Sequence, residues 1–101
     1  MHLVQILLPL YDNEGQRLPH ALHQKVKAEL TRRYKGLTAY ANTPAEGLWS
    51  TGKRTNRDQI VIYEVMTPRK NSAWWKRYRA SLEKRFKQQF VVIRAQKIIL
   101  Y

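Results

Sequence analysis

The sequence predicts a single small α+β domain built from one antiparallel sheet and two helices. Its 101 residues have room for one hydrophobic core. Four apolar segments and two amphipathic segments follow one another in the order β-α-β-β-α-β. No internal repeat, linker or low-complexity segment divides the chain, so residues 1–101 are expected to form one domain.

The first half of the chain predicts a strand, a helix and a second strand. The apolar run over residues 4–10 is typical of a strand, and the Asp, Asn and Gly that follow it favour a turn. A helix is expected over residues 19–34 because Pro19 suits a first helical turn and apolar residues recur every four positions. That stripe consists of Leu18, Leu22, Val26, Leu30 and Tyr34. The alternation of side chains with a period of two over residues 37–42 predicts the second strand.

The second half predicts a connection, a strand, a helix and a last strand. Residues 43–57 are polar and are expected to connect two strands. Residues 60–66 are continuous and rich in β-branched side chains, which favours a strand buried on both faces. Asn71 or Ser72 is expected to cap the second helix. Its apolar stripe consists of Trp75, Tyr78, Leu82 and Phe86. Residues 90–100 are expected to form the last strand.

With right-handed crossovers, this order of elements closes as a ferredoxin-like βαββαβ sandwich. The expected strand order is 4-1-3-2, with both helices on one face of the sheet. Side chains alternate along each strand, so one set should pack under the helices. That set is Val4, Ile6, Leu8, Leu10, Val61, Tyr63, Val65, Val91, Ile93 and Ala95.

The opposite face of the sheet is expected to be apolar yet uncovered by helices. Its apolar members are Leu3, Leu7, Ile60, Ile62, Met66 and Val92. Exposed apolar patches of this kind mark an interface or a ligand groove. Pairing of two sheets would bury it, as in the dimeric α+β barrels built from two ferredoxin-like units, so we expect a homodimer. A polar row is predicted to cross this face, formed by Arg94, Gln5, Glu64 and Tyr40.

Two interpretations of this row remain open. In the first, it is a hydrogen-bonded network that fixes how two copies pair, because buried charges are tolerated only when paired. In the second, it lines a site for a small, anionic molecule. Glu64 is then the catalytic proton-transfer group, Arg94 holds an anion and Tyr40 donates a hydrogen bond.

The long connection between the second and third strands carries two further candidates. Long loops often carry function. Trp49 is a candidate lid and Arg54 a second anion-binding residue. The alternative is that Trp49 closes the end of the core while the basic residues lie in water.

The chain carries a large positive charge. Nineteen Lys and Arg against seven Asp and Glu give a net charge of +12, which attracts polyanions. An alternative function is therefore binding of nucleic acid through the second helix. Its basic residues are Lys76, Arg77, Arg79, Lys84, Arg85 and Lys87. A solvated helix face without a partner, in a purely structural interaction protein, is the other alternative.

Several classes of chemistry are excluded or unsupported. The chain has no cysteine, so it forms no disulfide and has no thiol nucleophile. No phosphate-binding loop, nucleophile elbow or dinucleotide motif is present, and we expect no cofactor. His20 and His23 are expected to be surface residues rather than metal ligands. No targeting segment or membrane span is apparent, so we expect a cytoplasmic protein without a membrane partner.

Four short motifs support a family resemblance. They are LPLYD at residues 8–12, GLTAY at 36–40, EGLW at 46–49 and WWKRY at 74–78. Together they resemble small bacterial proteins of unknown function with a ferredoxin-like or dimeric α+β-barrel build, and more weakly the DUF3574-type domains. The latter are usually exported, whereas this chain shows no export signal. The resemblance implies the fold and dimerisation, and it brings no activity.

Overall fold

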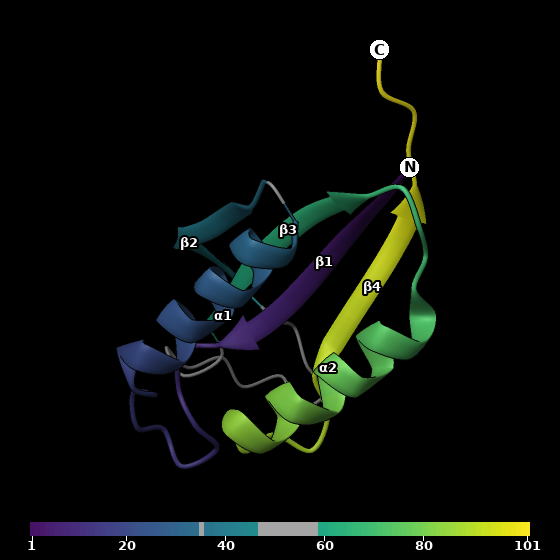
Figure 1. The fold of residues 1–101 in the computed structure, drawn as a ribbon. Helices are drawn as coiled ribbons and strands as arrows, with labels where there is room; N and C mark the ends of the chain where they lie inside the picture. Colours follow the sequence, from purple (N-terminus) through teal and green to yellow (C-terminus); the bar gives the residue numbers. More distant parts are fainter. Residues whose placement is uncertain (35, 47–58) are drawn as a thin grey trace.

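The computed structural model describes residues 1–34, 36–46 and 59–101, with the backbone alone for residues 40–46. Six elements follow one another in the predicted order β-α-β-β-α-β (Figure 1). They are β1 (His2–Pro9), α1 (His20–Arg33), β2 (Thr38–Glu46), β3 (Gln59–Thr67), α2 (Ser72–Arg85) and β4 (Val92–Lys97).

The four strands form one antiparallel sheet in the order β2-β3-β1-β4. Read in the opposite direction, this is the predicted order 4-1-3-2, so the α+β class and the strand order are confirmed. Both helices lie over the same face of the sheet (Figure 1). Neither of the described helices lies over the other face.

The core lies between this helix-bearing face and the two helices. Side chains of β1 and β3 alternate between buried and partly exposed, as their period of two requires. The helices contribute buried residues every three or four positions, which is the spacing of one helix face. The fully buried core residues of the strands are Val4, Ile6, Leu8, Val61, Tyr63 and Val65, as predicted, and those of the helices are Val26, Leu30 and Leu82.

Three expectations about the strands are corrected. β2 continues to Glu46, so residues 43–46 belong to a strand rather than to the connection. β4 is shorter than expected, and Phe90 lies before it with 62% of its surface exposed. β3 is fully buried on one face only, because its side chains on the other face are partly or largely exposed in the described part of the chain. Met66 on that face is 52% exposed.

The helices differ from expectation at two points. Asn71 occupies the N-cap position of α2, but its backbone is left-handed, with a φ of 47°, and its side chain makes no capping hydrogen bond. His23 is buried, with 4% of its surface exposed, so the expectation of a surface histidine is wrong. Neither described helix has the length and apolar character that crossing a membrane requires.

Candidate functional site

Three polar residues lie side by side across the sheet face that carries no helix. Gln5 of β1 stands opposite Glu64 of β3 and opposite Arg94 of β4. The Gln5 amide nitrogen donates to Glu64 Oε2 over 2.5 Å, and Arg94 Nε donates to Gln5 Oε1 over 2.7 Å. The predicted alignment of these three residues is therefore confirmed. We call them the polar row.

The fourth predicted member of the row, Tyr40, has a different register. Tyr40 pairs with Ile62, and Thr38 is the residue that stands opposite Glu64. The pairing of β2 with β3 is irregular between Tyr40 and Ala45. Tyr40 therefore shows a register shift of two residues from the predicted position. This shift moves the residue by about 7 Å along the strand.

The other two predicted ligand-binding residues, Trp49 and Arg54, lie outside the described residues. The candidate site that the structure describes is therefore the polar row and the side chains around it.

Apolar side chains surround the polar row along its strands. Leu3 and Leu7 flank Gln5 on β1, and each is partly exposed. Ile62 and Met66 flank Glu64 on β3, and Val92 precedes Arg94 on β4. A carboxylate and a guanidinium, linked by an amide, thus cross a surface that is mainly apolar along β1 and β3, with Thr38 and Gln96 as further polar residues of the same face. Such a surface can hold an acidic group near Arg94 and exchange a proton at Glu64.

One residue of the predicted nucleic-acid surface has an internal partner. The Arg85 guanidinium of α2 donates to both carboxylate oxygens of Glu29 on α1, over 2.6 and 3.0 Å. The Tyr78 hydroxyl donates to the same carboxylate over 3.0 Å. Burial raises the pKa of Glu29, but the hydrogen bonds from Arg85 and Tyr78 outweigh it, so the pKa lies below its usual value. Arg85 thus joins the two helices.

The other five basic residues of the predicted surface differ in their surroundings, and Lys87 lies beyond the end of α2 at Arg85. Arg79 Nε lies 3.8 Å from Glu83 Oε2, and its guanidinium carbon lies 5.3 Å from the centroid of the Phe90 ring. Four side chains are exposed and keep their charge at the surface: Lys76, Arg77, Lys84 and Lys87. The surface available to a polyanion on α2 is therefore smaller than the sequence predicts.

Sequence reasoning missed a buried polar pair in the core. His23 Nδ1 lies 2.7 Å from the Tyr63 hydroxyl oxygen, and His23 Nε2 lies 3.0 Å from the carbonyl oxygen of Pro9. The ring of Phe86 meets the imidazole edge to face, at 5.1 Å between centroids. Burial lowers the pKa of His23 below its usual value, so the imidazole is neutral at pH 7.

Among residues 1–34, 36–46 and 59–101, no group of three or more His, Asp or Glu is placed to hold a metal ion. Comparison with protein-family models, curated proteins and solved structures finds no match for this chain. The resemblance indicated by the sequence motifs therefore stays a prediction.

Proposed function

We propose that this chain is a ferredoxin-like unit of a homodimer of the dimeric α+β-barrel type, in which two copies pair through the sheet faces that carry no helix. We further propose that the polar row binds a small, anionic molecule at this interface. One observation carries the proposal: a hydrogen-bonded row of Glu64, Gln5 and Arg94 crosses the sheet face over which no described helix lies. We call this the open face.

The energetics of this face support pairing. Removing apolar surface from water contributes about 25 cal/mol per Å². The polar row does not prevent this, because Gln5 satisfies hydrogen-bonding groups of both Glu64 and Arg94. In a twofold dimer each copy presents the same surface, so two polar rows would contribute to one interface.

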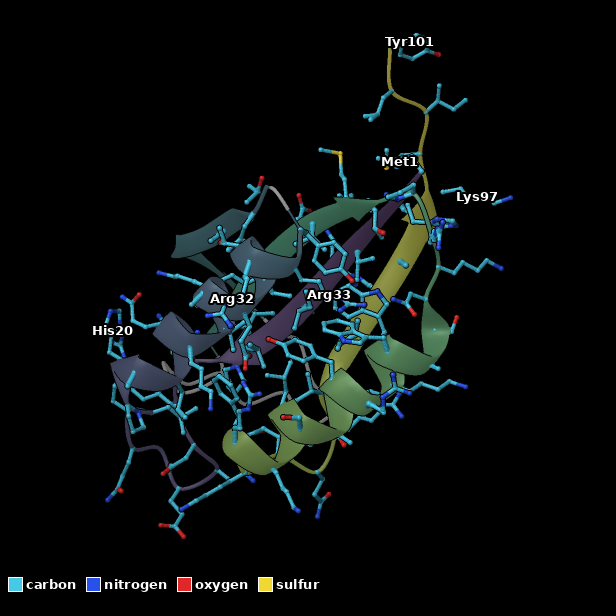
Figure 2. The ribbon with its side chains drawn as sticks, in the orientation of Figure 1. Met1, His20, Arg32, Arg33, Lys97 and Tyr101 are labelled. Atoms are coloured by element: carbon cyan, nitrogen blue, oxygen red, sulfur yellow. The ribbon has the colours of Figure 1, made fainter. Side chains whose placement is uncertain are left out.

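The C-terminal tail extends the apolar surface at one end of the sheet. Ile98 N donates to the carbonyl oxygen of Met1 over 3.0 Å, which holds the tail beside β1. Beyond this bond, Ile99 is 77% exposed and Leu100 is 56% exposed. Figure 2 shows the tail leaving the domain past Met1 and ending at Tyr101. Apolar side chains so exposed favour contact with a second copy.

The chemistry of the site follows from the residue types. Arg94 binds an acidic group of the ligand, and Gln5 fixes the orientation of both charged neighbours. Glu64 accepts or donates a proton when the bound molecule reacts. Tyr40, Trp49 and Arg54 remain in the proposal with their predicted roles: hydrogen-bond donor, lid and second anion-binding residue.

The dimer is tested by light scattering during gel filtration at micromolar concentration. We expect twice the chain mass of 12.0 kDa. Ile62→Lys places a charge at the centre of the open face and should yield a monomer. Ala28→Lys, at an exposed position of α1, adds the same charge elsewhere and should leave the dimer intact. A wild-type chain that elutes as a monomer contradicts the pairing.

The ligand site is tested by thermal shift with a panel of small carboxylates and phosphates. A compound that stabilises the wild-type protein through the polar row should lose its effect in Arg94→Gln. Arg77→Gln removes the same charge from the exposed surface of α2 and serves as the control. A dimer that no compound in the panel stabilises would identify a structural interaction protein without a site.

A second candidate function is binding of nucleic acid through α2. The observation that favours it is the set of exposed cations Lys76, Arg77, Lys84 and Lys87 on a chain of net charge +12. Arg85 and Arg79 support it less, because both have acidic neighbours within the domain. Retention on DNA as a function of salt concentration distinguishes this candidate.

A further inference from the structure

A pocket of about 360 Å³ lies beside α2, on the opposite face of the sheet from most of the polar row. Its floor is formed by the ends of β1 and β4, where His2 pairs with Lys97 and Val4 pairs with Ala95. Along β1 and β4 these four residues alternate in sequence with residues of the open face. They therefore belong to the helix-bearing face. Figure 2 shows Lys97 near Met1, at the end of the sheet from which the tail departs.

The pocket exists because the start of α2 does not fill the space above these strand ends. Ala95 was expected to pack under the helices, but it is exposed. Ser72 and Trp75, in the first turn of α2, form one wall, and Lys70 lies in the segment before the helix. The small Ala95 methyl group leaves room between the sheet and this wall.

The charge around the pocket has one sign. Lys70, Arg94 and Lys97 line it, and no Asp or Glu is among its described lining residues. Arg94 lies on the edge strand β4, and its Nε donates to Gln5 in the polar row, so Lys70 and Lys97 are the cations that belong to the pocket alone. The first turn of α2 adds backbone N–H groups, and the Asn71 side chain makes no hydrogen bond to them. A helix N-terminus also carries a partial positive charge.

An independent observation shows unused hydrogen-bonding groups at the same place. Trp75 is only 7% exposed and lines the pocket, yet its indole N–H has no acceptor among the described residues. Both ring nitrogens of His2, which also lines the pocket, are buried and have no partner among the described residues. Buried polar groups are normally hydrogen-bonded, so unpaired ones beside a pocket indicate a ligand that would pair with them.

The rest of the lining is apolar. Val4, Ile93 and Ala95 form the floor, and the Trp75 indole forms a wall against which a flat apolar group can pack. Ligand pockets usually span about 300–1,000 Å³, so this one suits a molecule with a single ring. We propose that the pocket binds a small organic anion, made of an apolar body of ring size and one carboxylate or phosphate group. This site lies over the helix-bearing face, opposite Gln5 and Glu64, and shares only Arg94 with the polar row of the proposed function.

The test uses benzoate and phenyl phosphate as probes, with benzyl alcohol as the neutral control and inorganic phosphate as the control without an apolar body. Binding is measured by calorimetry and by the NMR signal of the Trp75 indole N–H, which is assigned with Trp75→Phe. We expect at least one aryl anion to bind and to shift this signal, and both controls to bind much more weakly. The two probes distinguish a carboxylate site from a phosphate site.

Two variants test the location. Ala95→Leu fills the floor at an exposed position, so it should abolish binding without lowering the melting temperature. Lys97→Gln should weaken binding by about fivefold or more, because it removes one of the lining cations. Lys84→Gln removes the same charge at the far end of α2 and should leave binding unchanged. Absence of binding by both aryl anions, or equal binding in Ala95→Leu, overturns the proposal.

The pocket and the proposed dimer can be tested independently of each other. The described lining residues all come from one chain, so Ile62→Lys should keep wild-type affinity for the aryl anion even as a monomer. Loss of binding in that monomer would overturn the inference that one chain completes the pocket. A monomeric wild-type protein that binds the anion would contradict the proposed dimer alone.

Discussion

His23 is held by two hydrogen bonds whose directions define the tautomer of its neutral ring. The carbonyl oxygen of Pro9 can only accept, so Nε2 of His23 carries the proton and donates. In the neutral ring Nδ1 is then an acceptor, and the Tyr63 hydroxyl donates to it. Burial raises the pKa of Tyr63 to about 12, which keeps that hydroxyl protonated.

The lowered pKa of His23 predicts a loss of stability in mild acid. An unfolded histidine takes up its proton near pH 6.5, whereas the folded one does so only at lower pH. The free energy of unfolding should therefore hold above about pH 6.5 and fall below it, by at most about 1.4 kcal/mol per pH unit for this group. Urea unfolding at several pH values measures this slope.

Matched histidine variants assign the slope. His23→Gln should reduce the pH dependence between about pH 6.5 and 5, because the titrating group is gone. His20→Gln, at an exposed position one turn earlier on α1, should keep it. Equal slopes in the two variants would show that His23 is not the group responsible.

The sequence contains a signal for the burial of His23, but a strict repeat of four residues along the helix does not include it. A repeat of four residues from Leu18 selects Leu22, yet Leu22 is only partly buried. The buried residues of α1 are His23, Val26 and Leu30, spaced by three and four. Sequence alone does not show that Tyr63 and Pro9 are hydrogen-bond partners of His23, because both lie on strands and not on α1.

The pair of Glu29 and Arg85 is a charged contact between the two helices. Nη1 of Arg85 donates to Oε1 of Glu29 and Nη2 donates to Oε2, which is the geometry of a strong charged pair. We expect Glu29→Gln to lower the free energy of unfolding by about 1–3 kcal/mol. Arg79→Gln, which affects a more exposed pair at 3.8 Å, should change it by about 0.5 kcal/mol or less.

The pH dependence of this pair has a defined sign. Because the folded pKa of Glu29 is lowered, its contribution is present above the unfolded value of about 4.3 and is lost as the pH falls. Chemical denaturation of both variants at pH 7 and pH 3.5 measures it. A Glu29→Gln variant as stable as wild type at pH 7 would contradict a role in joining the helices.

The strands show which structural features alternation can predict. It placed Val4, Ile6 and Leu8 in the core and brought Gln5 beside Glu64, because β1 and β3 pair without interruption. It failed for Tyr40, because alternation does not determine how far two strands are shifted along each other, and Thr38 rather than Tyr40 stands opposite Glu64. The pocket beside α2 was missed because Ala95 lies on the same face of β4 as the core-facing Ile93, so alternation predicts that it is packed under a helix.

The positive charge of the whole molecule predicts weak binding of DNA that is sensitive to salt. Under the proposed function this binding needs no dedicated surface, so it should be clear at about 20 mM salt and largely lost by about 150 mM. Lys76→Gln with Arg77→Gln on α2 should weaken it as much as Lys25→Gln with Arg32→Gln on α1. Filter binding at several salt concentrations compares the two. A much larger effect of the α2 pair would favour the nucleic-acid function instead.

Pairing of two copies also predicts a melting temperature that depends on concentration. A dimer that unfolds to separate chains is stabilised by mass action, so its melting temperature rises with protein concentration. Scanning calorimetry from about 5 to 500 μM should show this rise for the wild-type protein and for Ala28→Lys. Ile62→Lys should melt at one temperature throughout, because its unfolding releases no partner. A wild-type melting temperature that does not change over this range would mean that the open face of the sheet stays in water.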